Sequence, residues 1–271
     1  MTGGRVRISI VTPSLNQGGF IERTVRSVLE QRGEFELEYL VFDGGSTDGT
    51  REILGRYADR LRFVVEPDTG QASAVNKGFR AATGEVVGWV NSDDLLLPGT
   101  LARVAEAFRS RPDLLWLHGR CEIVDEDDRA IRRWVSAYKD RRSRRYSREA
   151  LLVENFVSQV TVFWRRSVHE RVGYLDESLR YTFDYDFWLR LSELQAPLFL
   201  DEKLAAFRWY TRSKSGADFE RQFAEDAAVF RRHAPAGGLL GLRKRLKTWQ
   251  IVTAYRALRL LRSSSGGGAG A

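Results

Sequence analysis

Four segments of the chain combine carboxylates or amides with small residues in patterns that suit chemistry. The first is Trp89-Val-Asn-Ser-Asp-Asp94, in which an apolar run ends in two adjacent aspartates. Clustered carboxylate oxygens are suitable ligands for Mg²⁺ or Mn²⁺, ions that proteins often share with the phosphates of a substrate. Capping of the turn before Pro98 explains Asp93 and Asp94 equally well, so this segment alone leaves both interpretations open.

The second and third segments carry weaker signals. In Val41-Phe-Asp-Gly-Gly-Ser-Thr-Asp-Gly-Thr50 the glycines permit a tight turn and the close approach of a ligand, and Asp43 can accept hydrogen bonds from a base or a ribose. Ordinary turns share this composition. Gly70-Gln-Ala-Ser-Ala-Val-Asn-Lys-Gly78 begins a helical pattern, and its Lys77 can face a phosphate, although most lysines are simply exposed.

The fourth segment is Tyr181-Thr-Phe-Asp-Tyr-Asp-Phe-Trp-Leu-Arg190, with two aspartates at the start of an apolar helical pattern. Carboxylates at this position interact favourably with the helix dipole, which is sufficient reason for one of them. The other can act as a general base that takes a proton from a hydroxyl group. The pattern itself does not decide which role belongs to Asp184 and which to Asp186.

The first third of the chain contains the elements that would bring these segments together. Strands are expected at 7–12, 38–43, 62–66 and 86–91, and amphipathic helices at 20–31, 48–57 and 72–82. This alternation predicts an α/β fold, with a largely parallel sheet and helices on both faces. Ligands bind such sheets outside the carboxyl ends of the strands. That edge would carry Thr12-Pro13, Asp43-Gly44-Gly45, Glu66-Pro67-Asp68 and Asn91 to Asp94.

The second half of the chain is more mixed. Strands are expected at 115–124 and 160–165, helices at 148–153, 185–192 and 218–233, and a basic loop at 132–148. We expect one main domain over residues 1–235, a basic amphipathic helical appendage over 236–262 and a flexible Ser/Gly tail over 263–271.

The formal charge of +7 comes from the C-terminal part of the chain. Residues 227–271 contain nine Lys and Arg and no Asp or Glu, whereas the rest holds 34 basic against 36 acidic side chains. A body without net positive charge argues against a nucleic-acid partner. The single cysteine, Cys121, and the lack of an apolar leader or bilayer-length run predict a cytoplasmic protein, with the inner face of the plasma membrane as a second location.

The basic appendage has two apolar stripes on different helical faces. Arg and Lys between Leu and Trp are typical of a helix that lies on an anionic membrane surface. Packing against the domain or against a second subunit, with a solvated basic face, is the alternative. The stripes are Leu239, Leu242, Leu246 and Trp249, and Ile251, Tyr255 and Leu258.

In this order, the segments resemble the family 2 glycosyltransferases, which have the GT-A fold, from about Ile8 to Ser215. A bacterial, inverting type is indicated by an ordered series of motifs. These are Thr12-Pro-Ser-Leu-Asn-Gln-Gly18, Phe20-Ile-Glu22, Ser27-Val-Leu-Glu-Gln31, Glu66-Pro-Asp-Thr-Gly-Gln71, Asn76-Lys-Gly78, Gly88-Trp-Val-Asn-Ser-Asp-Asp94, Phe163-Trp-Arg-Arg166 and Asp184-Tyr-Asp-Phe-Trp-Leu-Arg190.

The resemblance implies transfer of a sugar from a nucleoside-diphosphate sugar, by default a UDP-sugar, to an acceptor hydroxyl. The acceptor would be a saccharide or a lipid-linked group in cell-surface polysaccharide or glycolipid synthesis. It also implies Asp93 as the ligand of Mg²⁺ or Mn²⁺ and Asp184 as the catalytic base. The implied donor-binding residues are Thr12, Pro13, Asp43, Gly44, Gln71, Asn76, Lys77, Asn91, Ser92 and Asp93.

Two positions depart from the pattern of the family. Asn91 replaces the first aspartate of the metal-binding motif, and Tyr210 stands where many relatives have a histidine. Cations nearby, namely Arg208, Arg212 and Lys214, are candidates to neutralise the leaving diphosphate. The alternatives are a catalytically inactive nucleotide-sugar-binding protein and a sugar nucleotidyltransferase, although the latter needs a cation-bearing loop after the first strand and Thr12 to Gly19 has none.

Overall fold

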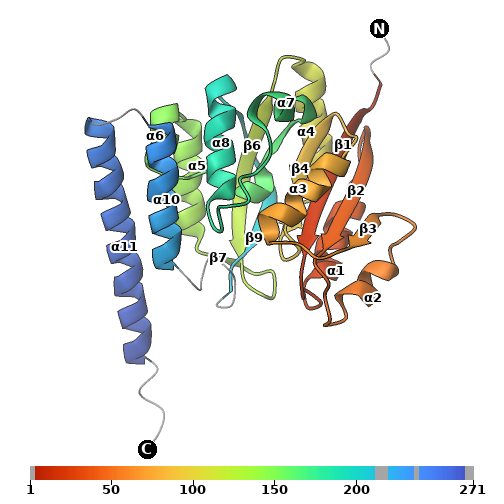
Figure 1. Cartoon of the computed structure of the whole chain (residues 1–271), viewed down its shortest axis with the longest axis horizontal. Coiled ribbons are helices and arrows are strands. Elements are labelled where there is room, and N and C mark those ends of the chain that lie inside the picture. Colours follow the sequence, from red (N-terminus) through yellow and green to blue (C-terminus); the bar gives the residue numbers. More distant parts are fainter. Residues whose placement is uncertain (1–3, 211–218, 235–237, 266–271) are drawn as a thin grey trace, which may run out of the picture.

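The computed structural model describes residues 4–210, 219–234 and 238–265, and it has the α/β architecture that the sequence predicts (Figure 1). The strands of the described chain form one nine-stranded sheet. They are β1 (Val6–Ser14), β2 (Phe35–Asp43), β3 (Arg62–Val65), β4 (Val86–Trp89), β5 (Leu95–Leu96), β6 (Trp116–Val124), β7 (Ala130–Ile131), β8 (Phe163–Arg165) and β9 (Leu198–Arg208).

Helices surround this sheet, and two short 3₁₀ turns, η1 (Gln159–Thr161) and η2 (Arg166–Val168), flank β8. The helices are α1 (Ile21–Leu29), α2 (Thr50–Gly55), α3 (Gln71–Ala81), α4 (Thr100–Ser110), α5 (Arg133–Arg144), α6 (Arg148–Val153), α7 (His169–Val172), α8 (Phe183–Leu194), α10 (Phe219–His233) and α11 (Leu239–Ser265). Within the described ranges, no helix combines the length and the apolar content that a bilayer crossing requires.

The sheet is parallel over its N-terminal half and mixed beyond it. Its strand order is β3-β2-β1-β4-β8-β6-β9-β5, with β7 paired to β6. Strands β3, β2, β1 and β4 are parallel, β8 is antiparallel to both of its neighbours, and β9 returns parallel to β6. The strand order changes direction at β1, which has β2 on one side and β4 on the other. This is the position where sheets of this kind bind ligands.

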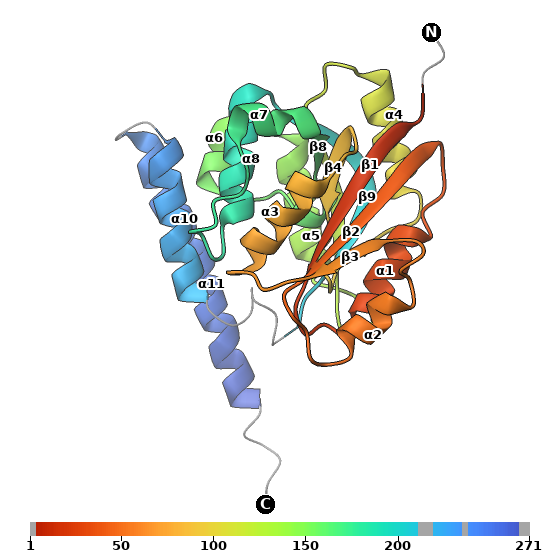
Figure 2. The same cartoon turned by 45° about the vertical axis from the view of Figure 1, so that its right-hand side comes forward.

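Helices cover the two faces of the sheet (Figure 2), and an apolar core lies on each face. Side chains alternate along β1, so that Ile8 and Ile10 join the core under α1, α2 and α4, whereas Val11 joins the core under α3, α6 and α8. Burial on both faces explains why this strand is an almost continuous apolar run.

Stacked tryptophans fix α8 against the strands that lead to the site. Trp188 of α8 lies with its ring centroid 6.2 Å from that of Trp116 on β6, at an interplanar angle of 8°. It also stacks on Trp89 of β4, at 6.0 Å and 23°. All three rings are buried. Large apolar surfaces in offset stacks hold α8 firmly, and with it the aspartates at the start of this helix.

The prediction of a loop over 132–148 is wrong, because residues 133–144 form α5. The helix escapes a search for apolar periodicity because the residues it buries are Asp140 and Ser143. Asp140 accepts a hydrogen bond from Arg120 of β6 at 2.8 Å, so a charge pair holds this face of the helix to the sheet. Helix α4 and strand β9 were also not expected, and the latter includes an exposed polar stretch at Asp201 to Lys203.

Helix α3 approaches β1 closely at Gly78. A Cβ atom at this position would lie well inside van der Waals contact with the Val11 side chain. The helix that is held at this short distance from β1 begins at Gln71.

We predict that Gly78→Ala lowers the free energy of unfolding by about 2 kcal/mol, because the added methyl group overpacks the contact with β1. Gly55→Ala is the matched control, since a Cβ at Gly55 meets nothing within 4 Å and alanine favours helix by about 1 kcal/mol. Urea denaturation of both variants measures the difference. Equal stabilisation by the two alanines would contradict the close packing of α3 on β1.

Candidate active site

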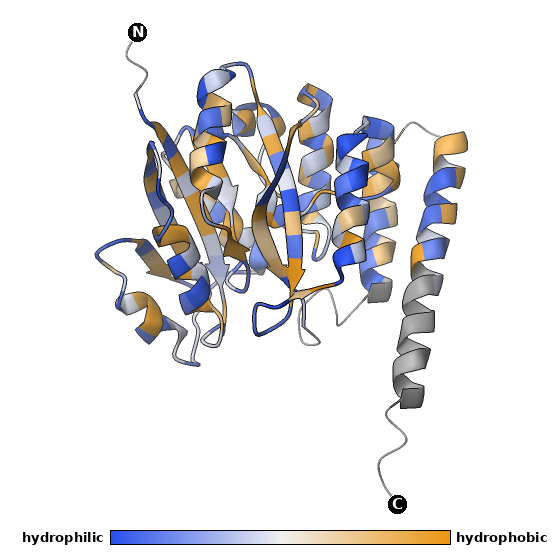
Figure 3. Cartoon of the chain, turned by 180° about the vertical axis from the view of Figure 1, so that it is seen from behind, coloured by the Kyte–Doolittle hydropathy of each residue, from blue (hydrophilic) through white to orange (hydrophobic). Residues whose placement is uncertain are grey.

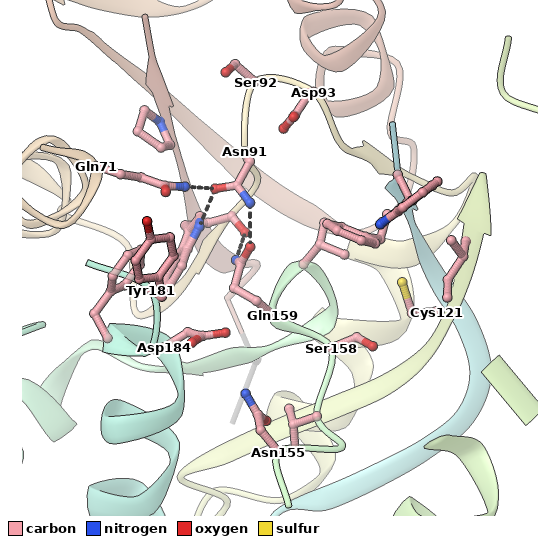
Figure 4. Close-up of a pocket in the computed structure, with 18 of the residues that line it drawn as sticks. Gln71, Asn91, Ser92, Asp93, Cys121, Asn155, Ser158, Gln159, Tyr181 and Asp184 are labelled. Atoms are coloured by element: carbon pink, nitrogen blue, oxygen red, sulfur yellow. Dashed lines mark hydrogen bonds between the residues drawn. The ribbon is translucent and has the colours of Figure 1, made fainter. Parts of the chain in front are cut away.

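A cavity of about 680 Å³ opens at the carboxyl ends of β1 and β4. Its lining comes from the ends of these strands and the residues after β9, and from the starts of α3 and α8. Figure 4 shows its residues directed into a common space. Of the residues expected from the sequence, Pro13, Gln71, Asn91, Ser92, Asp93 and Asp184 line this cavity.

The amide of Asn91 uses its full hydrogen-bonding capacity to hold this lining together (Figure 4). Its Oδ1 accepts from Gln71 Nε2 at 2.8 Å and from Trp89 Nε1 at 2.9 Å. Its Nδ2 donates to Gln159 Oε1 at 2.9 Å and to Asp94 Oδ2 at 3.1 Å. Two donors face Oδ1 and a carboxylate faces Nδ2, so the orientation of the amide is determined. Asn91 therefore organises the turn, and an aspartate here would bring like charge toward Asp94.

The two aspartates after Asn91 have different environments. Asp94 is fully buried and accepts a hydrogen bond from the backbone N–H of Arg208 at 2.9 Å. Burial raises the pKa of Asp94 well above its usual range, and the adjacent Asp93 carboxylate raises it further. Asp93 lines the cavity, and its Oδ2 accepts a hydrogen bond from the Tyr210 hydroxyl at 2.9 Å. Burial raises the pKa of Asp93 as well, and the hydrogen bond from Tyr210 opposes this shift in part.

Tyr210 thus reaches Asp93 although it differs from the histidine of many relatives. Arg208, by contrast, does not line the cavity. Its fully buried guanidinium pairs with Asp128, donates to the backbone carbonyl of Asp93 and lies over the ring of Phe20. The proposed role of Arg208 in neutralising a diphosphate is therefore wrong in this structure, because the charge is used to fix the turn. Arg212 and Lys214 lie outside the described residues.

Asp184 lies at the wall opposite Asp93, in the first turn of α8 (Figure 4). The backbone N–H of Tyr185 donates to Asp184 Oδ1 at 2.7 Å. The loop before Asp184 is held by Glu225 of α10, whose carboxylate accepts the backbone N–H groups of three consecutive residues at 2.6 to 2.7 Å. These residues are Arg180, Tyr181 and Thr182. Glu225 is therefore a positioning residue for Asp184.

The sequence did not decide which of Asp184 and Asp186 has the structural role. In the structure, Asp186 has it. It is buried, accepts from Arg190 Nε at 2.9 Å and lies 2.9 Å from Nε2 of His233 on α10. Burial alone would raise the pKa of Asp186, but the hydrogen bond with His233 and the charge of Arg190 outweigh burial and lower it. Asp186 thus joins α8 to α10.

Two of the expected donor-binding residues are buried beneath the cavity. Thr12 is fully buried, with its hydroxyl 3.1 Å from that of Tyr39. Asp43 is almost fully buried, and its carboxylate accepts the backbone N–H groups of Gly45 and Ser46 and the Ser46 hydroxyl. Gly44 follows it, and a Cβ there would lie 2.6 Å from Asp68 Oδ2. The glycine therefore allows Asp68, which lines the cavity, to approach β2.

Asn76 and Lys77 do not line the cavity either. The Asn76 amide donates to the carbonyl of Leu175 at 2.9 Å and accepts the N–H of the same residue at 3.0 Å, so it fixes the loop before α8. Lys77 Nζ donates to the carbonyl of Pro67 at 2.6 Å and lies 3.0 Å from Glu66. In this structure both side chains are engaged with loops of the chain itself.

Several wall residues were not expected from the sequence. Arg132 and Lys139, at the start of and within α5, line the cavity, and the Arg132 guanidinium lies 3.5 Å above the ring of Trp209. Gln159, which fixes Asn91, also donates to the carbonyl of Trp89 at 2.8 Å. No local pattern marks Gln159, because its partners are about seventy residues away in the chain.

The site offers a divalent cation few protein ligands. Among the residues that the structure describes, no three acidic, histidine or cysteine side chains are grouped so as to hold a metal ion. Asp93 is accessible from the cavity, whereas the Asn91 amide is fully used and Asp94 is buried. One carboxylate fits a cation that takes most of its ligands from substrate phosphates and water, as Mg²⁺ commonly does.

Comparison with known proteins identifies the relatives of this chain. The sequence model of glycosyl transferase family 2 matches residues 9–173. The chain is 31% identical to chondroitin synthase of Escherichia coli over 193 residues, covering 69% of this chain and 26% of that protein. It is 26% identical to an uncharacterized glycosyltransferase of Rickettsia typhi over 209 residues, covering 74% of this chain. The chain spans 63% of the length of that relative.

Solved structures confirm the GT-A fold. The mannosyltransferase PcManGT from Pyrobaculum calidifontis, in complex with GDP-Man and Mn²⁺, superposes with a TM-score of 0.67 at 20% identity, covering 98% of this chain and 76% of that one. Staphylococcus aureus TarS gives a TM-score of 0.62 at 17% identity, covering 91% of this chain and 43% of that one. Shorter TarS chains are known in complex with UDP and with UDP-GlcNAc.

We predict that Asp186→Asn lowers the free energy of unfolding at pH 7 by about 2 kcal/mol, because it weakens charged hydrogen bonds in the interior. Since the pKa of Asp186 is lowered by folding, this part of the stability is present above the ordinary value of 3.8 and is lost as the pH falls through the folded-state value. Urea denaturation against pH measures both effects. The control variant Asp184→Asn removes the same charge from the same helix turn and should leave the free energy of unfolding nearly unchanged. Equal losses of stability in the two variants would contradict the structural role of Asp186.

Proposed function

Because this chain belongs to glycosyl transferase family 2, we propose that it is an inverting glycosyltransferase. It would move a sugar from a nucleoside-diphosphate sugar to an acceptor hydroxyl. The observation that carries the proposal is the presence of two carboxylates, Asp93 and Asp184, on opposite walls of one cavity (Figure 4). A donor diphosphate beside Asp93 and an acceptor beside Asp184 would leave the anomeric carbon between them.

The reaction needs a base on the face of the sugar that is opposite the leaving group. Asp184 would take the proton of the acceptor hydroxyl as its oxygen attacks the anomeric carbon. The N–H of Tyr185 and the loop held by Glu225 orient this carboxylate before substrate arrives. A single displacement inverts the anomeric centre, and no second nucleophile is required.

The leaving diphosphate would lie at the Asn91-Ser92-Asp93 turn. Asp93 would hold Mg²⁺ or Mn²⁺ there, and the cation when bound would neutralise charge that develops on the diphosphate. Pro13 and Gln71, which also line the cavity, would contact the donor. The remaining expected donor residues (Thr12, Asp43, Gly44, Asn76 and Lys77) would act in this proposal mainly by supporting the walls.

The acceptor is inferred to be a saccharide or a lipid-linked group used in cell-surface polysaccharide or glycolipid synthesis. The relatives named chondroitin synthase support a saccharide acceptor. Arg132 over Trp209 gives the lining of the cavity a flat, cationic surface on which a sugar ring can lie. A lipid-linked acceptor would bring the reaction to a membrane surface.

Neither alternative function accounts for the residues around the cavity as well as glycosyl transfer does. A nucleotidyltransferase needs a cation beside the first loop to grip a triphosphate, but Arg23 pairs with Asp128 and with the carbonyl of Glu126. An inactive binding protein gives no reason for Asp184 to line the cavity while its neighbour Asp186 is fully engaged in the interior.

We predict that UDP, the default donor nucleotide, raises the melting temperature of the protein in the presence of Mn²⁺. A ligand that binds only the folded state stabilises it according to its concentration relative to its dissociation constant. GDP, dTDP, CMP and ATP, each with and without Mn²⁺, complete the panel. In Asp93→Asn the shift should shrink only when Mn²⁺ is present, whereas Asp127→Asn, in an exposed turn, should behave as the wild type. Equal loss without metal would contradict cation binding by Asp93, and no shift with any nucleotide would contradict the donor class.

We predict that Asp184→Asn lowers the transfer rate by about a hundredfold or more, because the amide cannot accept the proton of the acceptor hydroxyl. The melting-temperature shift with the donor nucleotide should stay as in the wild type, since Asp184 lies on the acceptor side. Release of nucleoside diphosphate with a saccharide acceptor measures the rate. Unchanged turnover would remove Asp184 from the role of base.

A further inference from the structure

Helix α11 packs on the rest of the protein through Leu240, which contacts an apolar core, and through two lysines. Lys244 is buried, forms an ion pair with Asp226 of α10 and lies 5.2 Å from the ring centroid of Tyr185. Lys247 donates to the Tyr138 hydroxyl at 2.6 Å and lies 3.3 Å from Glu154. These contacts with α10, α5 and the end of α6 determine which face of α11 is turned inward.

The outward face of α11 is therefore apolar. Spacings of three, four and three residues place four large apolar side chains on one side of the helix. Their exposed fractions are 80% for Leu239, 54% for Leu242, 53% for Leu246 and 65% for Trp249. We call these four residues the outer stripe; the described part of α11 is seen at the edge of the molecule in Figure 3. A helix that only packs on its own domain has the reverse arrangement, so the stripe indicates a partner.

The charge around the outer stripe identifies that partner. Arg243 and Arg245 are exposed beside it and form no ion pair with any acidic residue that the structure describes. The sequence contains no Asp or Glu from residue 227 to the end. A second copy of this helix would oppose arginines to arginines, which is unfavourable. An anionic lipid surface satisfies both features, because its phosphates attract the arginines and its acyl region accepts Leu and Trp side chains.

We propose that the outer stripe of α11 docks the protein on an anionic lipid bilayer. The helix lies along the membrane surface, with Leu242, Leu246 and Trp249 in the boundary between headgroups and acyl chains and with Arg243 and Arg245 at the phosphates. Figures 1 and 2 show α11 continuing beyond the rest of the described chain on the side on which β1 ends. The cavity opens at the same ends of the strands.

The test is flotation of the full chain with vesicles of phosphatidylcholine alone or mixed with phosphatidylglycerol. We expect the wild type to bind the mixed vesicles. The triple variant Leu242→Ser, Leu246→Ser, Trp249→Ser should lose this binding. The double variant Arg243→Gln with Arg245→Gln should weaken binding about thirtyfold, because each basic side chain near an anionic surface strengthens binding about fivefold. Arg103→Gln with Arg109→Gln removes the same charge from exposed positions of α4 and should leave binding unchanged.

Two results would overturn the proposal. Equal binding to neutral and anionic vesicles, or full binding by the triple variant, would show that the outer stripe does not dock on anionic lipid. Absence of vesicle binding together with a dimer in analytical ultracentrifugation that the triple variant abolishes would assign the stripe to a second copy of the chain. Melting temperatures equal to that of the wild type confirm that each variant is folded. The test uses no sugar donor, so its outcome is independent of the catalytic proposal.

Discussion

The saturated amide of Asn91 is the interaction on which the site depends. Four hydrogen bonds connect it to the end of β4, the start of α3, η1 and Asp94. Asp94 in turn accepts the backbone N–H of Arg208 at the end of β9, so elements far apart in sequence meet at one turn. A carboxylate could accept the same two donors but not donate to Gln159 and Asp94. Position 91 is therefore a structural centre of this turn, and Asp93 is the carboxylate of the turn that lines the cavity.

The charged residues around the cavity form two groups that differ in burial. Asp186 and Arg208 are buried in ion pairs within the protein, where removing a partner would leave an uncompensated charge. Asp94 is buried as well and accepts the backbone N–H of Arg208. Asp93 and Asp184 instead border the cavity, where a substrate can reach them. The same division separates Asp184, which lines the cavity, from Asp186, which is buried in ion pairs two residues later on the same helix.

Much of the fold could be predicted because its elements carry local patterns. The strands β1, β2 and β4 and the helices α1, α3, α6, α8 and α10 have apolar periodicity that follows directly from their buried faces. Helix α5 lacks such a face, since Asp140 and Ser143 are its buried positions. The wall residues Pro13 and Asn91 to Asp93 could be named because parallel strands end at one edge, whereas Gln71 and Asp184 were implied by the resemblance to the family. That Asn76 fixes the loop at Leu175 could not, because this pairing joins distant segments and leaves no trace in local composition.

Two adjacent carboxylates of helix α10 contact different parts of the protein. Glu225 holds the backbone that precedes Asp184, and Asp226 pairs with Lys244 of α11. Burial raises the pKa of Asp226 and lowers the pKa of Lys244, as expected where loss of hydration outweighs mutual attraction. The two contacts come from neighbouring residues of α10, so this helix joins α11 to the backbone that precedes Asp184. The surroundings of Asp184 consequently depend on the placement of α10, a helix that comes later in the chain.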